Sequence, residues 1–250
     1  MELSIVLVIL GLLVGGVLTG QSLIRAAQLR AVSTEYENYY TAIQSFRDKY
    51  FGLPGDLTTA ENFWGKDNAH CAADPGTAMT PGTCNGNGDG QITFPNAANA
   101  TGESSQFWKQ LALAGLIAGS YDGLGHDYFA GGNSQCIIGT SCPASKFTGG
   151  GWGVVWLGNY TGDTYTYTIN FGNIMTFGAA DPNYIPDQPI LTPADMWNID
   201  TKVDDGMPAR GRAIAENWAA CTTSTSMTDL TGTYQLSETN PVCALRFIIN

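Results

Sequence analysis

The feature that most constrains this chain is an apolar run near its start, from Leu3 to Gly20, whose only polar side chains are Ser4 and Thr19. As an α-helix the run would be roughly 27 Å long, close to the ~30 Å hydrocarbon core of a bilayer. One carboxylate, Glu2, stands at the head of the run, and the next charged residue is Arg25. A carboxylate at the edge of an apolar segment costs free energy unless it reaches an interface or a partner.

The helical pattern continues beyond Gln21 but becomes apolar on one side only. Apolar side chains then recur at alternating steps of three and four residues and form one stripe on a helix face: Leu29, Val32, Tyr36, Tyr39, Ile43, Phe46 and Tyr50. The first proline, Pro54, lies in the helix-stopping sequence GLPGD (52–56). We therefore predict one helix over about residues 2–51, roughly 75 Å long. Its first half requires lipid or other apolar helices around it, and its second half requires a domain along one flank.

The cysteines place the remaining chain outside the cytoplasm. They fall into three near-neighbour pairs: Cys71 and Cys84, Cys136 and Cys142, Cys221 and Cys243. Six cysteines allow fifteen connectivities, so local pairing is a preference and not a deduction. Disulfides fit better than zinc, because no CxxC spacing occurs and the histidines lie far apart. The net charge of -11 argues against nucleic acid as a main partner.

Two shorter helices are expected further along the chain. The first covers about residues 104–118, with Phe107 and Leu111 on its buried face and Gly119 as its stop. The second covers residues 192–203, with Thr192 as N-cap and Pro193 in its first turn.

Antiparallel strands account for much of the remaining pattern. GWGVVWL (151–157) and DTYTYTINF (163–171) predict a hairpin, because apolar and polar residues alternate in the second segment. TYQL (233–236) and CALRFII (243–249) predict a closing hairpin. The stripe on the long helix is expected to pack on the sheet face that carries these side chains: Tyr165, Tyr167, Ile169 and Phe171. The predicted fold class is therefore α+β, with a long N-terminal helix packed on an antiparallel sheet in a single loop-rich domain.

Glycines in the apolar half of the helix form two GxxxG pairs, Gly11 with Gly15 and Gly16 with Gly20. Such small-residue notches let helices approach one another closely in an apolar medium, although a glycine can also simply face lipid. We divide the chain accordingly into an apolar segment, residues 1–25, for a membrane or a filament core, and an extracellular domain, residues 26–250, which includes the amphipathic half of the helix.

A known family shares this arrangement. ELSIVLVILGLLVGG, followed by an amphipathic helix and a cysteine-bearing domain, resembles the type IV pilins and the related type II secretion pseudopilins. The resemblance is most specific from Glu2 to about Gly55. The stretches YFGLPGD, CNGNGDGQITF, FWKQLALAGLI, GGGWGV and IDTKVDDGMPARGR also resemble large, disulfide-containing members of this group. The resemblance implies a pilin-like fold.

The same resemblance implies how the amino terminus is made. In the family a basic leader is cut off, the new terminus is N-methylated, and a Glu lies four residues later in the apolar run. Here the Glu is at position 2, and the aromatic residue usual at the processed terminus is absent. We therefore expect that Met1 stands directly before the family's Glu and that the true mature terminus lies upstream of it.

By this resemblance the chain would be the main subunit of a type IV pilus-like extracellular filament. Its partners would be copies of itself, the inner membrane before assembly, and the pilus or secretion assembly machinery. The family pairs Glu2 with the terminal amine of a neighbouring subunit, so Glu2, Gly11, Gly15, Gly16 and Gly20 would be assembly residues. Two alternatives remain: a pseudopilin of a type II secretion system, and a membrane-tethered extracellular binding module that never polymerises.

One loop has the spacing of a calcium site. In CNGNGDGQITFPN, four oxygen-bearing side chains follow the frame of a calcium-binding loop: Asn85, Asn87, Asp89 and Asn96. Glu103 could complete the site from outside the loop. Only Asp89 is a carboxylate within the frame, so an Asn-Gly turn held by a Cys71–Cys84 bridge is the alternative. No cofactor is required by the sequence, and structural calcium is the one candidate.

Catalytic motifs are missing from the sequence, which contains no GxSxG, HExxH, Walker or strand-linked GxGxxG pattern. His70 and His126 lie in predicted surface loops. A second acidic group, Asp200, Asp204 and Asp205, is expected to be a solvated helix end. We therefore do not expect an enzyme.

Overall fold

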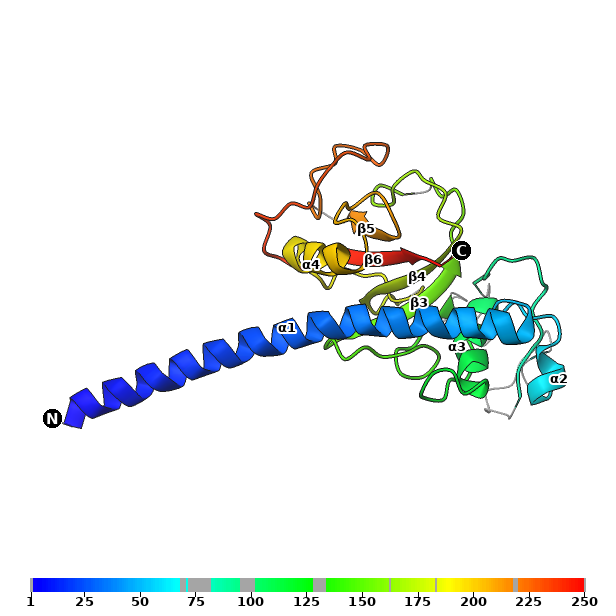
Figure 1. Ribbon diagram of the computed structural model, residues 1–250. Helices are drawn as coiled ribbons and strands as arrows, with labels where there is room; N and C mark the ends of the chain where they lie inside the picture. Colours follow the sequence, from blue (N-terminus) through cyan, green and yellow to red (C-terminus); the bar gives the residue numbers. More distant parts are fainter. Residues whose placement is uncertain are drawn as a thin grey trace.

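A computed structural model describes residues 2–67, 71, 82–94, 102–127, 134–161, 163–182, 184–217 and 220–249. One long helix, α1 (Glu2–Tyr50), carries the folded domain along its second half, while its first half projects away from the domain (Figure 1). This confirms the predicted single helix over about residues 2–51. The N-terminus of α1 lies at one end of the molecule, and α2 and the last turns of α1 lie at the other.

The apolar stripe on the second half of α1 lies against the domain. Val32, Ile43 and Phe46 are fully buried, and Leu29 and Tyr36 nearly so. Arg25 and Gln28 are half-buried, and Leu29 is the first buried side chain of α1 among the described residues. The change from an all-round apolar helix to a one-sided one therefore marks where the domain begins.

Three short helices complete the helical part: α2 (Ala60–Trp64), α3 (Glu103–Leu113) and α4 (Pro193–Val203). α4 begins as predicted: Thr192 Oγ1 accepts the Asp195 N–H, and the Asp195 carboxylate accepts the Thr192 N–H. α3 is shorter than the predicted 104–118. It stops because Gly115 adopts a left-handed φ of 71° and the Leu116 N–H donates back to the Leu111 carbonyl.

The main sheet is antiparallel, in the order β3 (Gly150–Trp156), β4 (Asn173–Ala179), β6 (Cys243–Ile248) and β5 (Ala213–Asn217). Two short strands, β1 (His126–Asp127) and β2 (Ser134–Gln135), pair separately. The α+β class predicted from the sequence is confirmed.

Each predicted hairpin has one correct and one wrong member: residues 151–157 and 243–249 contribute β3 and β6, whereas residues 163–171 and 233–236 form no strand of the sheet. β3 pairs with β4 and not with residues 163–171, where the Asp163 side chain accepts the backbone N–H groups of Tyr165 and Thr166 and folds the segment into turns. β6 lies between β4 and β5, whereas residues 233–236 contribute only an isolated bridge from Tyr234 to Thr222. Two of the four strands of the main sheet, β4 and β5, were therefore not indicated by the sequence patterns.

Aromatic contacts join α1 to this sheet. Tyr36 stacks on Phe247 of β6, with ring centroids 3.7 Å apart, and Tyr39 meets the edge of Trp152 of β3 at 5.5 Å. The stripe therefore packs on β3 and β6. Its predicted contact with Tyr165, Tyr167, Ile169 and Phe171 is wrong, because that segment is not part of the sheet.

All three disulfides join the near neighbours that the sequence favoured: Cys71–Cys84, Cys136–Cys142 and Cys221–Cys243. The last of these ties the segment after β5 to the first residue of β6.

Candidate functional site

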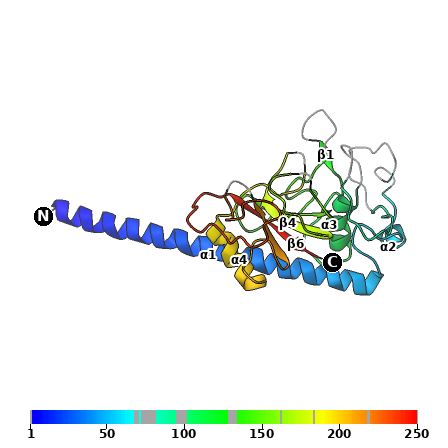
Figure 2. The ribbon, with the colours of Figure 1, turned by 90° about the horizontal axis from the view of Figure 1, so that it is seen from above.

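The apolar half of α1 projects free of the folded domain (Figure 2). The large apolar side chains that the structure describes on this half have exposed fractions between 51% and 72%: Val6, Ile9, Leu10, Leu12, Leu13, Val14, Val17, Leu18, Leu23 and Ile24. Within the described residues, α1 is the helix long and apolar enough to cross a membrane. An apolar surface of this kind is stable only when lipid or another apolar helix covers it.

The four glycines of the assembly prediction lie on this exposed half. A Cβ atom added at Gly11, Gly15, Gly16 or Gly20 would meet no other atom within 4 Å. Packing inside one chain therefore does not explain them, although each glycine weakens a helix by roughly 1 kcal/mol relative to alanine. Because successive residues are rotated by about 100°, the Gly11–Gly15 and Gly16–Gly20 notches point in two different directions. Two neighbouring helices could pack there at once.

Glu2 is the first residue of α1, but its side chain lies outside the described residues. The structure therefore places it at the far end of the exposed helix and says nothing of its partner.

Arg25 marks the point where α1 meets the domain. Its guanidinium forms an ion pair with Asp195 in the first turn of α4 and lies 4.4 Å from the centre of the Phe147 ring. Three residues later the Gln28 amide donates to Thr148 Oγ1 at 2.8 Å. These contacts fix the direction in which the free half of the helix leaves the domain.

Glu35 is a second attachment point, which no sequence pattern indicated. Its carboxylate accepts three hydrogen bonds, from Ser145 Oγ at 2.6 Å, the Lys146 N–H at 2.9 Å and Trp152 Nε1 at 2.9 Å. Hydrogen bonds to a charged group are among the stronger ones, so this cluster holds the beginning of β3 on α1.

The predicted calcium loop brings together carboxylates from three separate segments. Ligand oxygens of Asp56, Asp89 and Glu103 all lie within 4.8 Å of one another. Asp89 and Glu103 were predicted, whereas Asp56 was missed because it precedes the loop by about thirty residues of sequence. Among the described residues, no lysine or arginine forms an ion pair with any of the three.

Backbone amides of the same loop surround these carboxylates. Asp56 accepts the N–H groups of Gly88 and Gly90 at 2.5 and 2.9 Å, and Glu103 accepts those of Asn87 and Thr93 at 3.2 and 2.9 Å. Glu103 Oε2 also accepts the Thr93 hydroxyl at 2.6 Å, whereas Glu103 Oε1 and both Asp56 oxygens accept one N–H each and so retain a lone pair for a cation.

The asparagines of the predicted calcium frame do not all join the cluster. Asn85 Oδ1 accepts the Glu61 N–H, and Asn87 Oδ1 accepts the Asp89 N–H. Asn96 and His70 lie outside the described residues.

The second acidic group is not the solvated helix end that the sequence suggested. Asp200 is fully buried; its carboxylate accepts the Tyr234 hydroxyl at 2.6 Å and the Gly206 N–H at 3.1 Å. Burial raises the pKa of Asp200 from 3.8 to about 7 against the lowering effect of these hydrogen bonds. Only Asp205 of the three is exposed.

This burial predicts that domain stability falls as the pH rises from about 4 to about 7. The pKa of Asp200 is higher in the folded chain than in the unfolded one, so the folded state binds the proton more tightly, and that advantage of up to about 4 kcal/mol is lost through this window. Asp187, whose pKa burial also raises to about 7, contributes with the same sign. Urea unfolding at several pH values should show the decline, and Asp200→Asn should make it shallower, leaving the part that comes from Asp187. An unchanged pH slope in Asp200→Asn would contradict this assignment.

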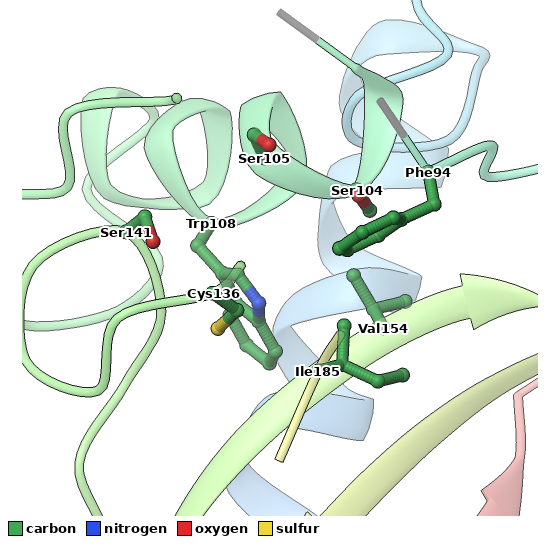
Figure 3. Close-up of a pocket in the computed structure, with 8 residues that line it drawn as sticks. All are labelled: Phe94, Ser104, Ser105, Trp108, Cys136, Ser141, Val154 and Ile185. Carbon is green, nitrogen blue, oxygen red and sulfur yellow. The ribbon is translucent and has the colours of Figure 1, made fainter. Parts of the chain in front are cut away.

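A small cavity lies between α3, β3 and the neighbouring loops, lined by side chains that include Ser104, Trp108 and Val154 (Figure 3). Its volume of about 10 Å³ is enough for one water molecule and too small for an organic ligand. Ser104 Oγ is buried without a hydrogen-bond partner among the described residues, and a water at this place would satisfy it.

No protein-family model, no curated protein and no solved structure matches this chain. A functional proposal therefore rests on the exposed half of α1, the domain attached to it and the acidic loop.

Proposed function

We propose that this chain is the main structural subunit of a type IV pilus-like extracellular filament and that it polymerises through the apolar half of α1. The observation that supports this most is the continuous helix whose exposed apolar half is joined, through Arg25 and Glu35, to a disulfide-bonded domain. Such a subunit can exchange one apolar environment for another without unfolding its domain. Lipid would cover the helix before assembly, and neighbouring helices would cover it afterwards.

The glycine notches and Glu2 favour a polymer over a plain membrane tether. A tether needs only an apolar surface. Neither notches that point in two directions nor a carboxylate at the head of the helix would strengthen its insertion in the membrane. In a filament the notches would admit close neighbours. Glu2 would pair with a neighbour's terminal amine and so select one stagger between subunits.

Two other functions agree with the same helix. A type II secretion pseudopilin would build a short periplasmic filament, and a membrane-tethered binding module would not assemble at all. The large domain, rich in threonine and glycine, suits a surface that is permanently exposed outside the cell, which favours the pilus; the three disulfides fit an oxidising compartment and agree with either filament.

Shearing of wild-type cells separates these functions. A main pilus subunit should be abundant in the sheared filament fraction and should form fibres visible by electron microscopy. A pseudopilin should stay with the cell envelope. A complete absence of polymer from both fractions, with the chain in the membrane alone, would contradict both filament functions and leave the tether.

We also propose that the loop around Asp56, Asp89 and Glu103 binds a structural calcium ion. Three carboxylates with no ion-paired lysine or arginine among the described residues repel one another, and a hard divalent cation with oxygen ligands would offset that repulsion. Calcium at a hundred times its Kd would add about 2.7 kcal/mol of stability.

Removal of calcium should therefore lower the melting temperature of the domain. Asp89→Ala should abolish the response to the chelator, because Asp89 is exposed and its loss removes a ligand without opening the core. Asp48→Ala, which removes an exposed carboxylate of α1 outside the loop, should leave the response intact. Identical melting curves with and without chelator in the wild type would show that the loop is a metal-free turn.

A further inference from the structure

Large apolar side chains are also exposed at the end of the domain from which the free half of α1 departs. They are Trp197 of α4, with 42% of its surface exposed, and Leu236, with 53%. We call these two residues the proximal face. The core does not need them at the surface, because α4 already buries Met196 and Ile199 on its other side.

Trp197 lies close to the exit point of α1. It follows Asp195 by two residues, or about 3 Å along the axis of α4, and Asp195 forms the ion pair with Arg25. Asp195 faces α1, whereas Trp197, rotated by about 200°, lies on the outward side of α4. Figures 1 and 2 both show α4 beside α1 on the side of the domain nearest the free helix.

Leu236 is held at the same end by the strand ladder and a disulfide. Leu191, one residue before the N-cap of α4, pairs with Cys243, and Cys243 is bonded to Cys221. The Gln235 N–H donates to the Cys221 carbonyl at 3.0 Å. The segment that precedes β6 therefore lies beside the start of α4, with Leu236 exposed.

The length of the free helix determines what this end of the domain faces. The part of α1 before Arg25 is roughly 34 Å long, slightly more than the ~30 Å hydrocarbon core. When that part spans a bilayer, Arg25 lies at the headgroup level and the proximal face lies just above it. Tryptophan prefers this interfacial layer, and exposed leucine gains free energy there by leaving water.

We infer that, in the membrane-inserted monomer, the domain rests on the bilayer surface through Trp197 and Leu236. The inference depends on the membrane-inserted stage of the proposed function. The partner is the lipid surface itself, at the boundary of the bilayer that α1 crosses. This contact holds the domain in one orientation above the membrane, and it is released when the subunit leaves the bilayer.

Tryptophan fluorescence in vesicles tests this contact. Full-length chain is reconstituted at low protein-to-lipid ratio in phosphatidylcholine vesicles whose acyl chains are brominated near the carbonyl end, because bromine quenches only a nearby indole. Leu236→Trp should add a fluorescence component that the brominated lipid quenches and aqueous iodide does not. Trp197→Phe should remove such a component, one of the six native tryptophans.

Phe51→Trp is the matched control. Phe51 is 93% exposed and lies at the opposite end of the domain, roughly 39 Å along α1 from Arg25. Its added component should be quenched by iodide and not by brominated lipid.

Flotation of the vesicles separates the two ways in which the experiment can fail. If the chain floats with the lipid but Leu236→Trp behaves like Phe51→Trp, the membrane contact is overturned and membrane insertion stands. If Leu236→Trp is shielded from iodide without quenching by brominated lipid, protein covers the face and the inference is likewise wrong. If the chain does not float at all, the membrane-inserted stage of the proposed function fails, and the inference fails with it.

Discussion

Phe46→Ala is expected to lower the free energy of unfolding of the domain by about 3–5 kcal/mol. Phe46 is fully buried on the stripe of α1, with its ring 4.6 Å from that of Tyr50 and 6.0 Å from that of Trp64. Alanine would leave a cavity at the point where the long helix, α2 and the core meet. Urea unfolding followed by circular dichroism gives the change directly.

Phe51→Ala is the control for this experiment, because it removes the same side chain from the same helix end. Phe51 is 93% exposed and has a left-handed φ of 57°, so its loss should change the free energy of unfolding by less than about 0.5 kcal/mol. A cost for Phe46→Ala as small as that would mean that the second half of α1 is not the hydrophobic spine of the domain.

Local signals in the sequence were enough to predict the helices that lie at the surface or have strong caps. The stripe from Leu29 to Tyr50 and the stop at GLPGD predicted α1, and Thr192 followed by Pro193 predicted the start of α4. These signals depend on residues within one or two helical turns of each other, so they can be recognised from the sequence without knowledge of tertiary contacts.

The strands were harder because their pattern depends on what covers each face. β4 lies between β3 and β6 in the sheet, and its side chains are buried on both faces of the sheet. Its sequence NIMTFGA therefore shows no alternation of apolar and polar residues and did not indicate a strand. The alternation in DTYTYTINF had another origin. Tyr167 and Phe171 are buried, with the Tyr167 hydroxyl bonded to Thr222 and Ser224, while Asp163 and Arg246 bond Thr166, which stands between Tyr165 and Tyr167.

The residues of the candidate site likewise fall into those that a local sequence pattern indicated and those that it did not. The glycine notches and Glu2 are contiguous in sequence, and the pattern alone indicated them. Asp56 and Glu35 accept hydrogen bonds from residues far along the chain, Gly88 and Ser145, and no local sequence pattern indicates such a contact.

Glu2→Ala is expected to abolish or severely reduce filament assembly while leaving the monomer folded, disulfide-bonded and inserted in the membrane. Loss of one partner of a buried ion pair leaves the other charge uncompensated, at a typical cost of ~3–5 kcal/mol for each subunit contact. The domain should be unaffected, because it first contacts α1 at Arg25, roughly 34 Å along the helix. A plain tether has the opposite expectation, since removing a carboxylate from a membrane helix only eases its burial.

Filament yield in the sheared fraction of cells that express Glu2→Ala, relative to wild type and to Glu37→Ala, tests the central claim most directly. Glu37 is an exposed carboxylate in the second half of the same helix, so its removal changes the charge of α1 equally without touching the proposed pair. We expect wild-type yield from Glu37→Ala and little or no filament from Glu2→Ala, with equal amounts of monomer in the membrane. Equal filament yield from all three strains, or no filament from wild-type cells, would contradict the account.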